Sequence, residues 1–284
     1  MPTYPASREL CAIGGMVSNN AGGEKSLTYG QTADYVHSLR AVLSDGNEYE
    51  LGPLSGDALK AKLAQQDFEG SLYRAMYELV THNAELITAA RPKVSKNSAG
   101  YQLWRVWDGD TRNLAKVLGG AQGTLGIITE ATLSLIKPKP FSRLLVSFID
   151  TIADIPGVVS AIRAHAPESL ESYDDKTFML AFRFMPEFAQ LLGARNIISL
   201  GLQFIPEAWM LLTHGVPRLV VLAEFSGDTD AEALAPAQAA EQSLRSLGIR
   251  TRMTQSANEA KKYWAIRRES FNLLRHHIRG RQTV

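Results

Sequence analysis

The chain has 284 residues, enough for about two domains of ordinary size. Its composition, 45% hydrophobic and 21% charged, is that of a globular protein and excludes a disordered, collagen-like or coiled-coil chain. With 30 Lys and Arg against 29 Asp and Glu, the formal charge is +1, so no overall field would attract a nucleic acid or an anionic membrane.

The cysteine content and the absence of long apolar runs indicate a cytoplasmic protein. Cys11 is alone and excludes an internal disulfide, and no Cys and His residues have the spacing of a structural zinc site. The N-terminus lacks the apolar run of a signal peptide, and no stretch reaches the roughly 18–20 apolar residues of a transmembrane helix. Peripheral contact with the inner face of a membrane stays open.

Two prolines, in Lys137-Pro138-Lys139-Pro140, predict a domain boundary near residue 140. In residues 1–140 glycines are clustered, and residues 36–51 predict a hairpin that turns at Asp45-Gly46. A strand over 126–136 follows from alternation on one face of Ile127, Thr129, Ala131, Leu133 and Leu135. The first half is therefore predicted to be dominated by strands, with loops at the glycines.

Residues 141–284 alternate between strand-like and helix-like segments. Strands are predicted at 144–149, 171–180, 218–225 and 249–255, and helices at 154–165 and 230–247. A last helix over 258–278 has one apolar face, formed by Trp264, Phe271, Leu274 and Ile278. This order predicts an α+β layer of helices on an antiparallel sheet.

A first glycine stretch, IGGMVSNNAGG at 13–23, combines unhindered backbone with small polar side chains. Glycine lets main-chain N–H groups approach an anion closely, and successive N–H groups can form a nest for a phosphate. Four glycines around Ser-Asn-Asn favour a ligand loop over a plain pair of turns.

A second glycine stretch begins LGGAQGTLG at 118–126 and continues directly into a strand, IITEATL at 127–133. No Gly-Lys-Ser/Thr follows, so it is not a Walker A loop, and it does not open a helix after a strand as a dinucleotide fingerprint does. By composition alone it is a glycine-rich turn.

Together with YG at 29–30, SDG at 44–46 and KNSAGY at 96–101, the two glycine stretches resemble the FAD-linked oxidases of the vanillyl-alcohol oxidase and p-cresol methylhydroxylase (PCMH) type. They are most similar to the branch with D-lactate, glycolate and D-2-hydroxyglutarate dehydrogenases. LESYDD at 170–175 and YWAIRRESFNLL at 263–274 resemble, less specifically, the substrate-side cap of that family. The resemblance implies an α+β fold: the second half of a PCMH-type FAD-binding domain over 1–140, then a ferredoxin-like α+β cap domain over 141–284.

The resemblance also implies which residues bind FAD. Those of the first stretch would line the pyrophosphate and ribityl chain: Gly14, Gly15, Ser18, Asn19, Asn20, Ala21, Gly22 and Gly23. Those of the second would flank the nucleotide end: Gly123, Thr124, Gly126, Ile127 and Ile128. Because both stretches must reach one cofactor, we expect them to lie side by side.

Two motifs of the family do not occur in this sequence, an RGGGTS-like loop that holds the flavin phosphates and an HGDGN-like motif whose histidine binds metal or takes the substrate proton. The chain is therefore expected to be the central part of a longer enzyme and to bind FAD weakly or not at all by itself. No metal ligand and no catalytic base is assigned.

A basic cluster precedes the second glycine stretch and contains Arg91, Lys93, Lys96 and Tyr101. The resemblance implies that this segment contacts the substrate carboxylate, since an anion entering a dry flavin pocket must be paired; the alternative is a solvated basic loop. By the same resemblance Arg267 faces the substrate. The other bases of the last helix are predicted to form its solvated face.

Two functions remain open. The first is an FAD-dependent dehydrogenase that oxidises a D-2-hydroxy acid: the C2 hydride passes to flavin N5, a base takes the hydroxyl proton, and the electrons leave to a quinone, cytochrome or flavoprotein. The second is a non-catalytic truncated product, or an assembly subunit of a split flavoenzyme.

Overall fold

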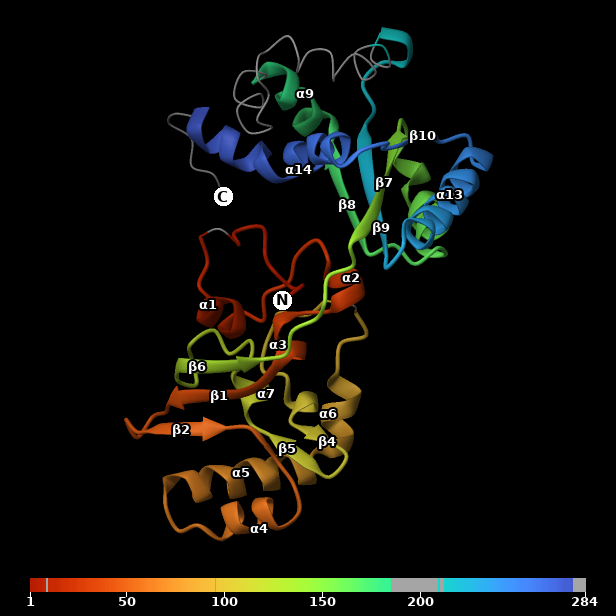
Figure 1. Ribbon diagram of the computed structural model, residues 1–284. Helices are drawn as coiled ribbons and strands as arrows, with labels where there is room; N and C mark the ends of the chain where they lie inside the picture. Colours follow the sequence, from red (N-terminus) through yellow and green to blue (C-terminus); the bar gives the residue numbers. More distant parts are fainter. Residues whose placement is uncertain (9, 95, 185–208, 210–211, 278–284) are drawn as a thin grey trace. The chain divides into compact units, whose positions relative to one another are not determined.

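The computed structural model describes residues 1–8, 10–94, 96–184, 209 and 212–277 (Figure 1). The chain divides into two compact units, unit 1 with residues 1–138 and unit 2 with residues 139–284. Each sheet belongs to one unit. The division falls within the proline segment at which the sequence predicts a boundary.

Unit 1 contains two small antiparallel sheets, with strand orders β2-β1-β6 and β3-β5-β4. The strands are β1 (Val36–Val42), β2 (Glu48–Leu51), β3 (Pro53–Leu54), β4 (Trp107–Asp108), β5 (Thr111–Asn113) and β6 (Ile127–Leu133). The helices are α1 (Ile13–Ser18), α2 (Ser26–Tyr29), α3 (Thr32–Tyr35), α4 (Gly56–Ala64), α5 (Phe68–His82), α6 (Ala84–Ala90), α7 (Ala115–Leu118) and the 3-10 turn η1 (Leu103–Arg105).

The predicted hairpin is confirmed by the pairing of β1 with β2, which places Leu39 opposite Leu51. The chain turns at Gly46, whose φ of +83° lies in the left-handed region that glycine adopts without strain. The carboxylate of Asp45 accepts a hydrogen bond from the Asn47 N–H at 3.2 Å and so stabilises the turn.

The predicted face of β6 is confirmed at Ala131 and Leu133 but wrong at Ile127 and Thr129, because the strand contains a bulge. Glu130 lies opposite Arg40 and Ile128 lies opposite Ala41, so an extra residue is inserted at position 129. The bulge reverses the alternation at the start of the strand. Ile128 therefore packs against the core together with Ala131 and Leu133, whereas Ile127 is 71% exposed. Leu135 lies beyond the strand and is exposed.

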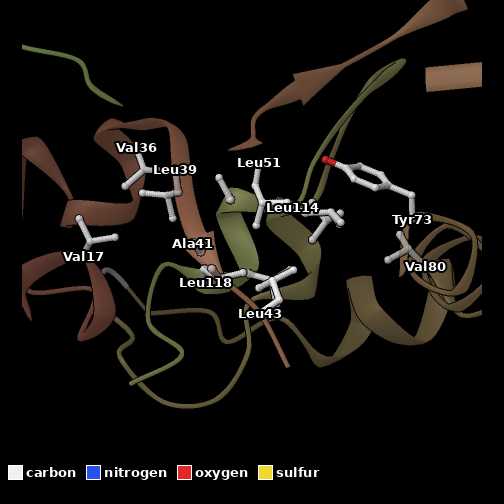
Figure 2. Close-up of a cluster of buried hydrophobic side chains, with 13 residues drawn as sticks. Val17, Val36, Leu39, Ala41, Leu43, Leu51, Tyr73, Val80, Leu114 and Leu118 are labelled. Atoms are coloured by element: carbon white, nitrogen blue, oxygen red, sulfur yellow. The ribbon is translucent and has the colours of Figure 1, made fainter. Parts of the chain in front are cut away.

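The prediction that strands dominate unit 1 is also wrong, because residues 56–90 form α4, α5 and α6. Apolar residues recur every fourth position of α5, at Phe68, Leu72, Met76 and Val80, and this stripe packs in the same core as the sheet. Figure 2 shows this core, in which side chains of α1, β1, β2, α5 and α7 meet.

Unit 2 has one antiparallel sheet with strand order β10-β7-β9-β8. Its strands are β7 (Phe141–Ile149), β8 (Ser169–Asp174), β9 (Leu219–Gly227) and β10 (Arg250–Met253). Its described helices are η2 (Ile152–Asp154), α8 (Ile155–Arg163), α9 (Asp175–Arg183), α13 (Asp230–Ser246) and α14 (Ala257–His277).

The order of strands and helices confirms the ferredoxin-like fold. Numbered along the chain, the strands lie in the order 4-1-3-2, and α8 and α13 are the two connecting helices of a βαββαβ unit. Side chains such as Leu145 and Ile149 pack with α8 and α13, whereas Leu144 and Val146 face α9 and α14. Figure 1 shows α13 on one face of the sheet and α9 and α14 on the other. Because helices cover both faces, β7 is apolar on both sides.

The strand predicted over 171–180 ends at Asp174, and a helix follows. The carboxylate of Asp174 accepts a hydrogen bond from the Thr177 N–H at 2.8 Å, which begins α9. This backbone hydrogen bond is the largest cause that lowers the pKa of Asp174. In the predicted last helix, Trp264 is buried as expected. The side chains of Phe271 and Leu274, and all of Ile278, lie outside the described residues.

Candidate functional site

The two glycine stretches lie side by side, which confirms the prediction. The Gly120 N–H donates to the Val17 carbonyl at 3.0 Å, and the Gln122 N–H donates to the Ser18 carbonyl at 2.8 Å. A Cβ on Gly120 would lie 3.2 Å from the Cβ of Asn20. Residues about a hundred positions apart in the sequence are thus joined through their backbones.

Neither stretch is wholly a loop. The first begins with α1, which contains Gly14, Gly15 and Ser18, and the chain reverses at Asn20, whose φ is +46°. The second follows α7 and has positive φ angles at Gly120, Gln122 and Gly123 before it enters β6. Short helices therefore carry the chain into each bend.

The glycines of the two stretches fall into two groups. Gly22, Gly23, Gly119, Gly120 and Gly126 are packed against protein atoms; at Gly126, for example, a Cβ would lie 2.7 Å from the Val42 carbonyl oxygen. A Cβ on Gly14, Gly15 or Gly123 would have nothing within 4 Å. Gly123 is explained by its φ of +79°, but packing explains neither of the glycines in α1.

The pair Gly14 and Gly15 weakens α1, because each glycine in a helix is about 0.8–1 kcal/mol less favourable than alanine. Both face open space. A surface without Cβ atoms allows the backbone to approach a ligand closely. Gly14 and Gly15 therefore leave the backbone of α1 open to close approach.

Only part of the nest of free N–H groups that the sequence predicts is present in the structure. The amides of the first stretch from Asn19 to Ala21 donate to carbonyls of α1, and most amides of the second stretch are bonded as well. In the part of the chain that the structure describes, the successive N–H groups of Gly14 and Gly15 at the start of α1 have no acceptor, and neither do those of Gly22 and Gly123. The first stretch therefore offers two successive donors at the start of α1 and a separate one at Gly22, and the second stretch offers one at Gly123.

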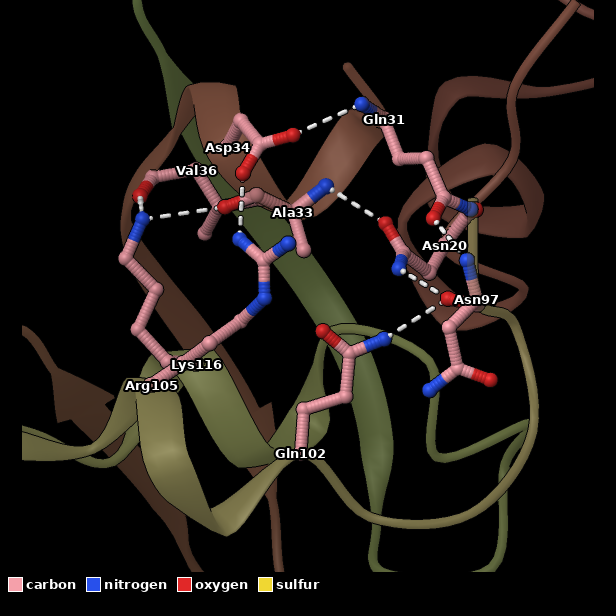
Figure 3. Close-up of polar contacts among 9 residues, drawn as sticks. All are labelled: Asn20, Gln31, Ala33, Asp34, Val36, Asn97, Gln102, Arg105 and Lys116. Atoms are coloured by element: carbon pink, nitrogen blue, oxygen red, sulfur yellow. Dashed lines mark hydrogen bonds and ion pairs between the residues drawn. The ribbon is translucent and has the colours of Figure 1, made fainter. Parts of the chain in front are cut away.

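Asn20 is fully buried, and its side chain points into the protein (Figure 3). Its Oδ1 accepts from the Ala33 N–H at 2.8 Å, and its Nδ2 donates to the Asn97 carbonyl at 3.2 Å. Its own carbonyl accepts from Nε2 of Gln31 at 2.8 Å. Asn20, chosen from the sequence as a cofactor contact, thus bonds to protein through both polar atoms of its amide.

Three charged residues hold α3, the short helical turn before β1. None of them was predicted as a site residue. Nζ of Lys116 donates to the carbonyls of Ala33 at 2.9 Å and Val36 at 2.6 Å, and Arg105 forms an ion pair with Asp34 (Figure 3). Burial lowers the pKa of Lys116, Arg105 lowers it further, and Asp34 opposes both. Lys116 lies in α7, so these bonds fix α7 and the second glycine stretch to the turn before β1.

The sequence contains a signal for the start of α3. Asp34 stands three positions after Gln31, and the two form a reciprocal capping box at the start of α3: the Gln31 N–H donates to Asp34 Oδ2 at 2.7 Å. Nothing comparable marks Lys116, a single base in the apolar run from Leu114 to Leu118.

The structure brings two of the predicted substrate residues to the glycine stretches. Cε of Lys96 would lie 3.3 Å from a Cβ on Gly22, and the Tyr101 hydroxyl is 2.8 Å from Oγ1 of Thr124. Arg91, at the end of α6, and Lys93 are exposed.

The remaining predicted residues are in other surroundings. Arg267 belongs to unit 2, where its Nη2 and Nε donate to Oε2 of Glu171 at 2.8 and 3.1 Å. Ser18 is half-buried, Asn19 is exposed, and Ala21 is buried and accepts from Oγ1 of Thr32 at 2.7 Å. Among the described residues, no three His, Cys, Asp or Glu side chains are grouped so that they could hold a metal ion. None of the described helices has the length and apolar composition of a transmembrane segment.

Comparison with protein families gives two matches along the chain. The model described as "FAD binding domain" matches residues 1–52, which include the first glycine stretch. The model described as "FAD linked oxidases, C-terminal domain" matches residues 138–283.

Curated relatives include D-2-hydroxyglutarate dehydrogenase of Pseudomonas putida, 34% identical over 240 residues, which are 82% of this chain and 22% of that protein. The enzyme of the same name from Escherichia coli is 32% identical over 60% of this chain and 17% of its own. D-lactate dehydrogenase of Anaerostipes hadrus is 27% identical over 64% of this chain and 29% of its own. The chain thus spans less than a third of the length of these relatives.

Solved structures show the same fold at low identity. An alkyldihydroxyacetonephosphate synthase superposes with a TM-score of 0.58 at 16% identity, over 97% of this chain and 41% of that one. A p-cresol methylhydroxylase superposes with a TM-score of 0.54 at 13% identity, over 96% and 45%.

Proposed function

Because this chain belongs to the FAD-linked oxidases, we propose that it forms part of an FAD-dependent dehydrogenase that oxidises a small D-2-hydroxy acid. The relatives named as D-2-hydroxyglutarate dehydrogenase, D-lactate dehydrogenase and glycolate oxidase subunit share hydroxy acids as their named substrates. The particular acid differs among them, so the proposal is for the class.

The proposal is carried by the direct backbone contact between the two glycine stretches, with the open glycines of α1 beside it. The residues that would hold FAD there are Gly14, Gly15, Ser18, Asn19, Gly22, Gly123 and Thr124. Gly22 and Gly123 would contribute N–H donors, and Ser18, Asn19 and Thr124 would contribute side-chain hydrogen bonds. Bound FAD would supply the hydride acceptor of the reaction.

The residues of this chain would act mainly by binding and orienting the acid. A carboxylate that enters a site with little water requires a cation or several donors. Lys96 and Tyr101 are suited to this role because both lie at the glycine stretches. Arg267 lies in unit 2, where Glu171 holds it in place, and its contact with the acid stays a prediction from the sequence.

The test is a titration of the purified chain with FAD, followed by flavin fluorescence and by the absorbance band at about 450 nm. We expect saturable binding, with riboflavin as a control that lacks the pyrophosphate and adenosine. The complex is then mixed under anaerobic conditions with D-lactate, glycolate or D-2-hydroxyglutarate, with L-lactate as the stereochemical control. Bleaching of the band by a D-acid would support the dehydrogenase.

Two results would count against the proposal. No binding at up to about 100 µM FAD, a concentration that detects even weak complexes, would refute the cofactor site in this chain. Binding without bleaching by any of these acids would instead favour the second hypothesis, a subunit without catalytic activity of its own.

A further inference from the structure

Residues 96–102 form neither helix nor strand, and within the described residues none of their N–H groups donates to a backbone carbonyl. Side chains hold the segment instead. The Asn97 N–H donates to Oε1 of Gln31 at 2.7 Å, and Nε2 of Gln31 donates to Oγ of Ser98 at 2.8 Å. The position of this segment therefore depends on residues far from it in the sequence.

Asn20 and Gln31 are the centre of these bonds (Figure 3). Nδ2 of Asn20 donates to the Asn97 carbonyl at 3.2 Å, and Gln31 donates to the Asn20 carbonyl at 2.8 Å. Both side chains are buried, with exposed fractions of 0% and 3%. A donor or acceptor that loses its partner here would not be compensated by water, so these bonds matter more than bonds at the surface.

The segment also contacts the glycine stretches at both of its ends. At one end the side chain of Lys96 lies against Gly22 of the first stretch. At the other end the hydroxyl of Tyr101 bonds to Thr124 of the second stretch. Lys96 and Tyr101, which are proposed to bind the substrate, therefore belong to a segment that connects the two glycine stretches proposed to bind the cofactor.

We propose that Asn20 and Gln31 are positioning residues that couple the order of residues 96–102 to the conformation of the glycine stretches. A ligand that orders the stretches then also places Lys96 and Tyr101, and by reciprocity an ordered segment favours binding of that ligand. This second step rests on the proposed FAD site; the first does not.

Trypsin measures the first step, because the segment contains its own cleavage site. The Lys96–Asn97 bond lies within the network, whereas the Lys93–Val94 bond lies outside it and serves as an internal reference. Under native conditions, the rate of cleavage reports the population of the opened segment.

Asn20→Asp replaces the donating nitrogen of a buried amide by an oxygen and adds a buried negative charge. The carboxylate still accepts from Ala33, but an oxygen replaces the amide that donates to the Asn97 carbonyl. We expect cleavage at Lys96–Asn97 to rise by at least about tenfold, which corresponds to about 1.4 kcal/mol or more. Cleavage at Lys93–Val94 should stay within about twofold.

A milder variant and a matched control complete this experiment. Ser98→Ala removes one acceptor of Gln31 and should give a smaller rise at the same bond. Asn83→Asp changes an exposed amide that donates to the Leu79 carbonyl, outside the network, and should change neither bond. Circular dichroism melts verify that each variant is folded. Unchanged cleavage at Lys96–Asn97 in both network variants would overturn the positioning role.

The second step is tested by adding FAD to the same digests. We expect FAD to slow cleavage at Lys96–Asn97 in the wild type, and to slow it less in the Asn20→Asp variant. If FAD binds but leaves this cleavage unchanged, the coupling is wrong while the proposed function stands. If FAD does not bind, the proposed function and the coupling to FAD both fail, and the digests without ligand still decide the positioning role.

Discussion

Replacing Gly15 by alanine should stabilise unit 1 and weaken its binding of FAD. Gly15 lies within α1 at an ordinary helical φ, and an added methyl group would meet no atom within 4 Å. Alanine should therefore raise the free energy of unfolding by about 0.5–1 kcal/mol. If FAD approaches this surface, the methyl group must displace it, and overpacking of this kind costs about 1–3 kcal/mol. The dissociation constant should rise by about 5- to 150-fold.

The assay combines urea unfolding, followed by circular dichroism, with an FAD titration followed by flavin fluorescence. Gly157 in α8 of unit 2 provides a matched control, because it is another helical glycine with nothing within 4 Å of an added Cβ. Gly157→Ala should give a similar gain in stability and leave FAD binding unchanged.

The prediction requires that Gly15→Ala increases stability and decreases the affinity for FAD. Unchanged affinity for FAD in the Gly15→Ala variant would show that the cofactor does not approach α1. The open surface of α1 would then not be part of the cofactor site. A loss of stability would show that the space beside Gly15 is not open, which would refute the argument at its first step.

Three further changes test the structure of unit 1. Gly126→Ala should lower the thermal melting temperature, because the new Cβ would lie 2.7 Å from a backbone carbonyl oxygen at the end of β1; an unchanged melt would contradict this packing. Tyr73→Phe should stabilise the protein by about 1 kcal/mol in urea unfolding at pH 7, because the buried hydroxyl has no hydrogen-bond partner among the described residues. Burial raises the pKa of Tyr73, so the folded protein keeps a proton that the unfolded chain releases above about pH 10. The wild type therefore loses stability above that pH, and the difference in free energy of unfolding between the variant and the wild type should grow there by up to about 1.4 kcal/mol per pH unit. A difference that does not change with pH would contradict this explanation. Arg112→Ala should destabilise unit 1 by about 2 kcal/mol, as measured by urea unfolding with tryptophan fluorescence, because the guanidinium carbon lies 3.4 Å from the centroid of the Trp107 ring. Recovery of only part of this loss by Arg112→Lys would distinguish stacking from charge.

Local sequence patterns were sufficient for much of the fold. The turn at Asp45-Gly46 and the alternation of strands and helices after residue 140 depend on neighbouring residues, and the structure contains both. The buried face of β6 could not be fully predicted from local patterns, because the bulge at position 129 is visible only in the pairing of β6 with β1. A single extra residue there was enough to turn Ile127 outward.

The candidate site was predictable in location but not in detail. Glycine spacing indicated two stretches that must meet, and they do. The inward direction of the Asn20 side chain depends on Gln31, Ala33 and Asn97, which are far from it in the sequence. Composition could not separate the glycines required by packing, such as Gly126, from those that face open space, such as Gly15. That distinction needs the neighbouring atoms.

The strand order of unit 2 has a consequence for the way in which this protein folds. The central strand β7 is made first, but both of its neighbours, β9 and β10, come much later in the chain. During synthesis β7 therefore has no partner strand until residue 227 has left the ribosome, and one of its edges stays unpaired until residue 253 has done so. Sheets that depend on such distant pairings form slowly, and their exposed strands are prone to aggregate meanwhile. We expect the newly made β7 to be the part of unit 2 that most needs protection by a chaperone.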